Sequence, residues 1–205
     1  NIGTLAVSRT TRTDVLGNSL REGDRVLFRS APCGRCARCA IGEACEYSKR
    51  YGFMPANEPP YLSGGFGEYV YVQPEPWLLR IPDHVSDERA LLSIVGNPVM
   101  LNGLERIGGI TVGETVAIQG SGAIGMAALV QSKLAGAGQV IMVGAPYHRL
   151  QTALELGADA VIDIDEVQDP DERASRVREL TNGLGADLVI ECSGGRGAVA
   201  EGIEM

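Results

Sequence analysis

The spacing of apolar residues changes character near residue 86 and divides the chain into two parts. Before that point, short runs alternate apolar and polar positions, which predicts strands at 4–7, 25–28, 68–72 and 77–81. Between the second and third of these runs, residues 31–60 are rich in Gly, Pro and Cys and predict a loop-rich lobe. The first part is therefore predicted to be β-rich.

The second part has short, almost continuous apolar runs separated by helical patterns. The runs predict strands at 116–118, 140–143, 160–162 and 188–190. Helices are predicted from about 86, over 123–135, around Leu150 and after the cap Asp169-Pro170, the last one burying Ala174, Val177 and Leu180. Apolar strands alternating with helices indicate a parallel sheet covered on both faces. We therefore predict an α/β protein with one domain at 1–96 and a doubly wound domain at 97–205.

Composition and charge exclude some classes of function. The chain is 44% hydrophobic and 21% charged, with a formal net charge of −8, which argues against general affinity for nucleic acid or for an anionic membrane. No basic and apolar leader precedes the first strand, and four of the five cysteines are closely spaced, which favours metal binding in a reducing compartment over disulfides. A cytoplasmic location is expected.

The four clustered cysteines are the most specific chemical signal in the sequence. They are Cys33, Cys36, Cys39 and Cys45. Four thiolates in one short loop predict a closed, tetrahedral and structural Zn²⁺ site. An iron–sulfur cluster is the competing metal, but the run lacks the Cys-Pro that usually closes such motifs. The fifth cysteine, Cys192, ends a predicted strand and is interpreted as a small core residue.

A glycine-rich loop follows the strand at 116–119 and opens the helix at 123. Gly120, Gly122 and Gly125 fit the pattern G-x-G-x-x-G in the strand–loop–helix context that its mechanism requires. Gly120 permits the tight turn, Gly122 lets the backbone approach a pyrophosphate, and Gly125 lets the helix press on the strand. The loop predicts a dinucleotide-binding domain.

The residue that senses the cofactor's ribose is expected after the second strand, and in NAD enzymes it is usually Asp or Glu. In this chain the segment reads Gly144-Ala145-Pro146-Tyr147-His148-Arg149, without an acid. The sequence favours NADP, with Arg149 facing the 2′-phosphate. The alternative is that Arg149 begins the next helix and contacts the adenosine ribose of NAD.

Together these residues resemble the zinc-containing alcohol dehydrogenases of the medium-chain dehydrogenase/reductase superfamily. The matching features include Gly23-Asp24-Arg25-Val26, the four cysteines, Ser63–Tyr69, Gly120–Gly125, Leu156–Asp159 and Val189–Gly194. The resemblance implies a partial GroES-like catalytic domain, with its structural-zinc lobe at 33–45, joined to a partial Rossmann domain. It also implies that Ile124 backs the nicotinamide ring, and that the full-length protein is a homodimer or homotetramer acting on a small-molecule alcohol or carbonyl.

The same resemblance leaves the catalytic residues unassigned. In the family, a catalytic zinc takes two ligands from a segment that would precede Asn1, so we interpret the chain as an internal fragment. The third ligand, usually Cys or Glu, is expected near Val95-Gly96-Asn97, where neither occurs. The leading hypothesis is a zinc-dependent oxidoreductase transferring hydride between NAD(P) and an alcohol or polyol. The alternatives are a zinc-free enone or quinone reductase of the same superfamily and a four-cysteine zinc binding module on an α/β domain.

Overall fold

The computed structural model describes residues 2–8, 11–48, 51–55, 57–59, 61–72 and 76–205. The chain separates into two compact units, Asn1–Leu91 and Leu92–Met205. The division falls inside helix α2 (Asp87–Ile107), five residues before the boundary predicted at 96/97. Each unit is described by itself.

The first unit contains two small antiparallel sheets. One has the order β1-β4-β5, formed by Ile2–Thr4, Arg25–Ser30 and Pro76–Arg80, and the other pairs β2 (Arg12–Thr13) with β3 (Ser19–Leu20). Leu20, Val26, Phe28 and Leu78 form a buried hydrophobic cluster in this unit. The ring of Tyr51 meets that of Phe28 edge to face, with centroids 5.3 Å apart. The strands predicted at 25–28 and 77–81 are therefore confirmed.

Two sequence-based predictions in the first unit are wrong. The first strand ends at Thr4 instead of spanning 4–7, and Val7 is exposed. Residues 68–72 form no strand, although Val70 and Val72 pack against the core while Tyr69 and Tyr71 are exposed. The alternation thus identified which side chains face the core. It could not show whether a partner strand lies alongside to receive hydrogen bonds.

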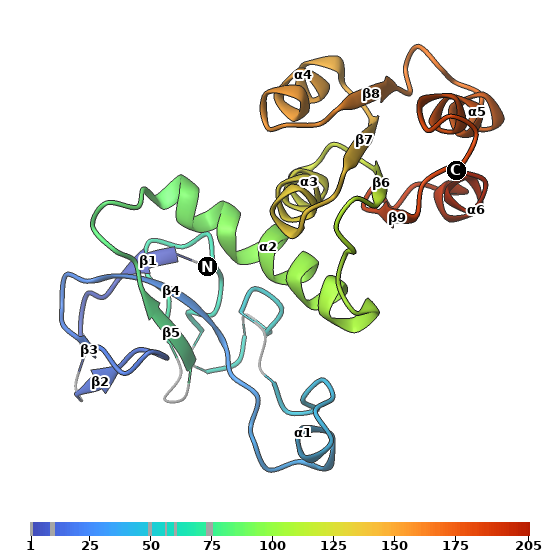
Figure 1. Cartoon of the computed structure of the whole chain (residues 1–205). Helices are drawn as coiled ribbons and strands as arrows, with labels where there is room; N and C mark the ends of the chain where they lie inside the picture. The colour runs from blue at the N-terminus through green and yellow to red at the C-terminus, as the bar shows by residue number, and fades with distance from the viewer. Residues whose placement is uncertain (1, 9–10, 49–50, 56, 60, 73–75) are drawn as a thin grey trace. The chain divides into compact units, whose positions relative to one another are not determined.

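The second unit is a parallel sheet with helices on both faces, as predicted. Its strands are β6 (Thr115–Gln119), β7 (Gln139–Gly144), β8 (Ala160–Asp163) and β9 (Leu188–Glu191), in the order β8-β7-β6-β9. The helices are α3 (Ala123–Ala135), α4 (Tyr147–Glu155), α5 (Pro170–Leu180) and α6 (Ala198–Ile203). Figure 1 shows α3 and α4 on one face of the sheet and α5 and α6 on the other.

The alternation of side chains along the strands supplies two hydrophobic cores. Val116 and Ile118 of β6 point into the core under α3 and α4, while Ala117 points into the core under α5. Ala174 and Val177 of α5 are buried as predicted, whereas Leu180 is 41% exposed, because it lies in the last turn of the helix. The predicted cap is present, since the Asp169 carboxylate accepts the backbone N–H of Asp171 at 3.0 Å.

The strand order places a crevice at the carboxyl edge of the sheet. The chain runs outward from β6 through β7 to β8 and then returns to lay β9 on the other side of β6. In open α/β sheets ligands bind outside the carboxyl ends of the strands where this reversal occurs. The fold therefore predicts a ligand-binding site at the loops after β6, β7, β8 and β9.

Candidate functional site

The loop after β6 has the backbone geometry that the glycine pattern requires. Gly120 has a φ of +104°, and a Cβ there would lie 2.8 Å from the backbone nitrogen of Ser193, after β9. A Cβ on Gly125 would lie 1.7 Å from the carbonyl oxygen of Gly120, so α3 meets the loop in direct contact. A Cβ on Gly122 meets no protein atom within 4 Å. Gly120 and Gly125 are fixed by packing, whereas Gly122 borders open space.

The open space is a cleft of about 430 Å³ along the carboxyl edge of the sheet. It is lined by the glycine loop, the ends of β7 and β9, and residues from α4, α5 and α6: Gln119–Gly122, Val143–Ala145, Arg149, Ile164, Arg173, Cys192, Ser193, Gly195, Arg196, Ala198 and Glu201. The cleft thus brings together Gly120, Gly122, Gly144 and Arg149 from the predicted cofactor site. Ile124 packs against the core below α3 and is not among these lining residues.

The end of β7 leaves no room for a side chain at the ribose-sensing position. A Cβ on Gly144 would lie 2.9 Å from both the backbone nitrogen and the hydroxyl oxygen of Ser121. That hydroxyl donates to the carbonyl oxygen of Ala145 at 2.6 Å. Ser121 therefore fills the space into which an Asp or Glu at position 144 would project. In the G-x-G pattern Ser121 occupies an unspecified position. Its hydrogen bond joins residues 24 positions apart, so the pattern could not indicate it.

The loop after β9 is held by its own carboxylate. One carboxylate oxygen of Glu191 accepts from the Ser193 backbone N–H at 2.6 Å, the Ser193 hydroxyl at 2.5 Å and the Gly194 N–H at 2.9 Å. The hydrogen bond from the Ser193 side chain is the main reason why the pKa of Glu191 is lowered. Burial raises the pKa of the neighbouring Cys192 to about 11, so this thiol is protonated at neutral pH. Cys192 is half-buried beside the core instead of fully buried.

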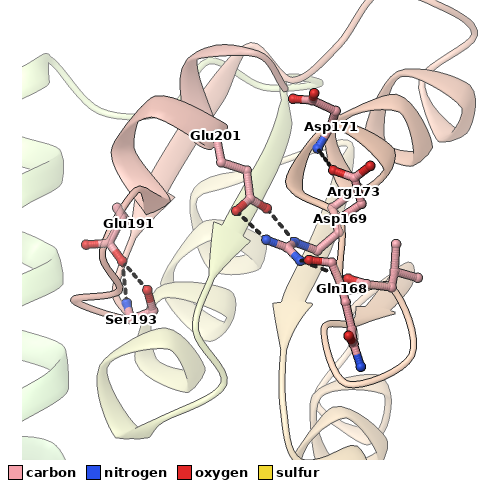
Figure 2. A network of polar contacts seen from close by, with 8 residues as sticks. Gln168, Asp169, Asp171, Arg173, Glu191, Ser193 and Glu201 are labelled. Carbon is pink, nitrogen blue, oxygen red and sulfur yellow. Dashed lines mark hydrogen bonds and ion pairs between the residues drawn. The ribbon is translucent and has the colours of Figure 1, made fainter.

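A buried ion pair forms part of the cleft wall. Arg173 of α5 and Glu201 of α6 meet through two contacts of 2.7 Å, and their side chains are 11% and 9% exposed. Figure 2 shows the guanidinium between Glu201 and the loop before α5. The hydrogen bond to Glu201 raises the pKa of Arg173, so the guanidinium stays charged. No sequence pattern links these residues, which lie 28 positions apart on different helices.

The four clustered cysteines lie together in the first unit. Their sulfur atoms all fall within 4.8 Å of one another, with Cys36 and Cys39 3.4 Å apart and Cys33 and Cys39 3.9 Å apart. Tetrahedral Zn²⁺ with sulfur ligands at about 2.3 Å requires sulfurs about 3.8 Å apart. Gly34 and Gly42 have φ values of +70° and +74°, which let the loop wrap around the sulfurs. The donor set and its spacing fit zinc.

Local backbone structure directs the sulfurs inward. Cys36 is the N-cap of the short helix α1 (Ala37–Ala40), where its sulfur accepts the backbone N–H of Cys39 at 3.4 Å. That hydrogen bond lowers the pKa of Cys36 to about 6. Interaction with the Cys36 sulfur raises the pKa of Cys39 to about 12. Cys36 is therefore more readily deprotonated than Cys39, and thiolates are the form that zinc binds.

The region around Val95-Gly96-Asn97 lies inside α2. A Cβ on Gly96 would be 2.7 Å from the Cβ of Ala127 and 2.9 Å from the carbonyl oxygen of Ala123, so α2 and α3 touch closely at this point. The Asn97 side-chain oxygen accepts from the Gln131 side chain at 3.4 Å. Asn97 thus contacts α3 through its amide. His84 lies in an exposed turn.

Two features of this chain are together typical of dinucleotide-binding dehydrogenases. One is the parallel sheet with a glycine-rich loop at its switch point, and the other is the four-thiol lobe. Comparisons with known proteins agree with this class. The family model described as alcohol dehydrogenase GroES-like domain matches residues 7–83, and the model described as zinc-binding dehydrogenase matches residues 123–205. The chain belongs to the zinc-containing alcohol dehydrogenases of the medium-chain dehydrogenase/reductase superfamily. Zinc and NAD(P) are the cofactors of this family, as the sequence predicted.

Individual relatives show how much of a family member the chain represents. It is 36% identical to a protein named probable alcohol dehydrogenase from Mycobacterium tuberculosis, covering 82% of this chain and 47% of that protein. It is 30% identical to one named probable D-xylulose reductase A from Aspergillus terreus, covering 91% and 50%. An alcohol dehydrogenase structure from Thermotoga maritima superimposes with a TM-score of 0.88 at 27% identity, covering 99% of this chain and 57% of that one. The chain spans about half the length of the relatives it matches.

Proposed function

We propose that this chain is part of an oxidoreductase that transfers a hydride between NAD(P) and a small alcohol or polyol, or its carbonyl product. The observation that supports this most directly is the cleft at the carboxyl edge, bordered by Gly122 and the start of α3. The helix start has neither a side-chain cap nor an acid in its first turn, so its N–H groups and dipole favour a pyrophosphate.

Each part of the chain has a distinct role in this proposal. Residues 1–96 belong to the catalytic domain, in which Cys33, Cys36, Cys39 and Cys45 hold a structural zinc. Residues 97–205 belong to the cofactor domain. The nicotinamide supplies hydride transfer when bound, and the chain's own residues bind the dinucleotide and fix its orientation. No residue of the chain is assigned a catalytic role. A cytoplasmic location and a homo-oligomeric full-length protein complete the proposal.

NADP is the favoured cofactor. Ser121 keeps a carboxylate out of the position beside Gly144, and Arg149 is exposed at the edge of the same cleft. The first turn of α4 contains no acid. A 2′-phosphate would therefore meet a cation and the N-terminus of a helix that has no acid in its first turn.

A reductase of the same superfamily that lacks a catalytic zinc is the second candidate. The observation that favours it is the engagement of Asn97 with Gln131, at the place where the family resemblance leads one to expect a ligand for a catalytic zinc. The four-thiol lobe favours the zinc-dependent enzyme. Metal analysis of the full-length protein separates them, because one zinc per chain fits the second candidate and two fit the first.

Gly122→Asp tests the cofactor site. Its side chain has room in the folded protein and would place a negative charge where the pyrophosphate is expected. Because like charges at close range cost several kcal/mol, NADPH binding followed by fluorescence should weaken about 100-fold or more. Gly103→Asp, on α2 where a Cβ also meets no atom within 4 Å, is the matched control and should bind normally. Unchanged NADPH affinity in Gly122→Asp would contradict the proposal.

A further inference from the structure

The Arg173–Glu201 pair lies where the adenosine end of a dinucleotide would enter the cleft. If the pyrophosphate rests on Gly122 and the adenosine ribose on the end of β7, the base attached to that ribose extends away from the glycine loop. The remaining lining residues in that direction come from the end of β8 and from α5 and α6, namely Ile164, Arg173 and Glu201.

The pair ties the loop between β8 and α5 to helix α6, and both segments contribute residues to the cleft wall. Arg173 Nη1 donates to the carbonyl oxygens of Val167 and Gln168, each at 2.8 Å, and these residues belong to the loop between β8 and α5 that begins at Ile164. Through Nε and Nη2 the same guanidinium holds Glu201, on the helix that follows the β9 loop. One side chain therefore fixes the spacing between both walls (Figure 2).

The energetics of such a pair point to a role beyond stability. Both side chains are about nine-tenths buried, and a buried ion pair often contributes no more to folding than apolar residues of equal volume would. By contrast, the Arg176–Glu172 pair on the same helix α5 is about half exposed on both sides and lies away from the cleft. It makes a natural comparison.

We propose that Arg173 and Glu201 are positioning residues that set the affinity for the adenosine half of the dinucleotide by holding the β8–α5 loop at a fixed separation from helix α6 and the β9 loop that precedes it. The inference rests on the proposed function of the cleft. It concerns the shape of the site and requires no direct contact between either charge and the cofactor.

The experiment compares fragments of the cofactor on the full-length protein. In Glu201→Gln, the bidentate acceptor for Arg173 is lost, and binding of ADP-ribose measured by calorimetry should weaken about tenfold or more, whereas reduced nicotinamide mononucleotide should bind as in the wild type. Amides of residues 164–169 and 193–198 should exchange hydrogen faster, with α3 unchanged. Glu172→Gln is the matched control and should leave ADP-ribose affinity within about twofold.

A double variant, Arg173→Met with Glu201→Met, separates positioning from stability. Apolar side chains of similar size should bring the melting temperature close to that of the wild type, while ADP-ribose binding stays weak because the donors to Val167 and Gln168 are gone. Wild-type ADP-ribose affinity in Glu201→Gln, or in the double variant, would overturn the inference alone. Failure of the wild-type protein to bind both ADP-ribose and 2′-phospho-ADP-ribose would overturn the proposed function, and the inference with it.

Discussion

The lobe around the four cysteines and the parallel sheet achieve order by different physical means. The sheet buries Val116, Ile118, Ile141 and Met142 completely, and its hydrophobic pattern is sufficient to specify it. Among its described residues, the lobe has one buried apolar residue, Cys36, and one helix, α1, which has no buried position. Its described backbone is otherwise turns and irregular segments. One region is encoded by burial of apolar surface and the other by the chemistry of four sulfurs.

The largest expected effect is therefore loss of the metal. Cys36→Ser removes one of four ligands, and structural zinc in small sites contributes about 10–16 kcal/mol of binding free energy, which is also folding free energy. We expect the variant to lose its zinc and residues 31–48 to become protease-sensitive, while the sheet keeps its far-ultraviolet signal. Metal content by mass spectrometry and limited proteolysis measure both effects.

Cys192→Ser is the matched control, because Cys192 lies apart from the lobe in the other unit. It should keep a full complement of zinc. A Cys36→Ser protein that retains all of its zinc would show that the lobe is ordered without this ligand. It would contradict the view that the four sulfurs order the lobe as apolar burial orders the sheet.

A smaller effect is expected in the sheet, where a single methyl group tests the packing of the glycine loop. Gly125→Ala puts a Cβ within 1.7 Å of the Gly120 carbonyl oxygen, so α3 must move away from the loop. Overpacking of this kind costs about 1–3 kcal/mol. Chemical denaturation should detect it, and a variant as stable as the wild type would show that the loop is more adaptable than the contact implies. Gly103→Ala is the control without a clash.

The smallest effect concerns the choice of cofactor. Arg149→Ala removes the exposed cation beside Gly144, and NADPH binding should weaken about 5- to 10-fold, as expected for loss of a surface phosphate contact worth about 1 kcal/mol. NADH binding should stay within about twofold. Arg176→Ala on α5 serves as the control. Tighter binding of NADH than of NADPH by the wild-type protein would reject the preference for NADP.

The contrast between the regions also explains what could be predicted from sequence. In the sheet unit, the bounds of α3 and the positions of all four strands followed from apolar spacing, because the strands are short, nearly continuous apolar runs in a sheet that is covered by helices on both faces. The same reasoning failed at 68–72, where alternation describes one face of a segment but not its pairing. In the lobe, the cysteine spacing indicated the metal directly, since ligand chemistry is local.

What sequence reasoning missed are contacts between distant residues. Ser121 and Ala145 are brought together by the pairing of β6 with β7, and Arg173 and Glu201 by the packing of α5 against α6. Neither pair has a characteristic spacing, so only the folded chain reveals them. The missing acid after β7 was visible in the sequence, but the close approach of Ser121 to Gly144 was not.

The carboxylate of Glu191 gives the cleft a further property. All three of its donors come from the two residues Ser193 and Gly194, directly downstream, so this part of the cleft wall has its shape before any ligand arrives. A wall that is already ordered loses little conformational entropy when a ligand docks against it. The loop after β9 is therefore a preorganised surface. Its conformational entropy is lost when the protein folds, so little of that entropy cost is subtracted from the binding free energy.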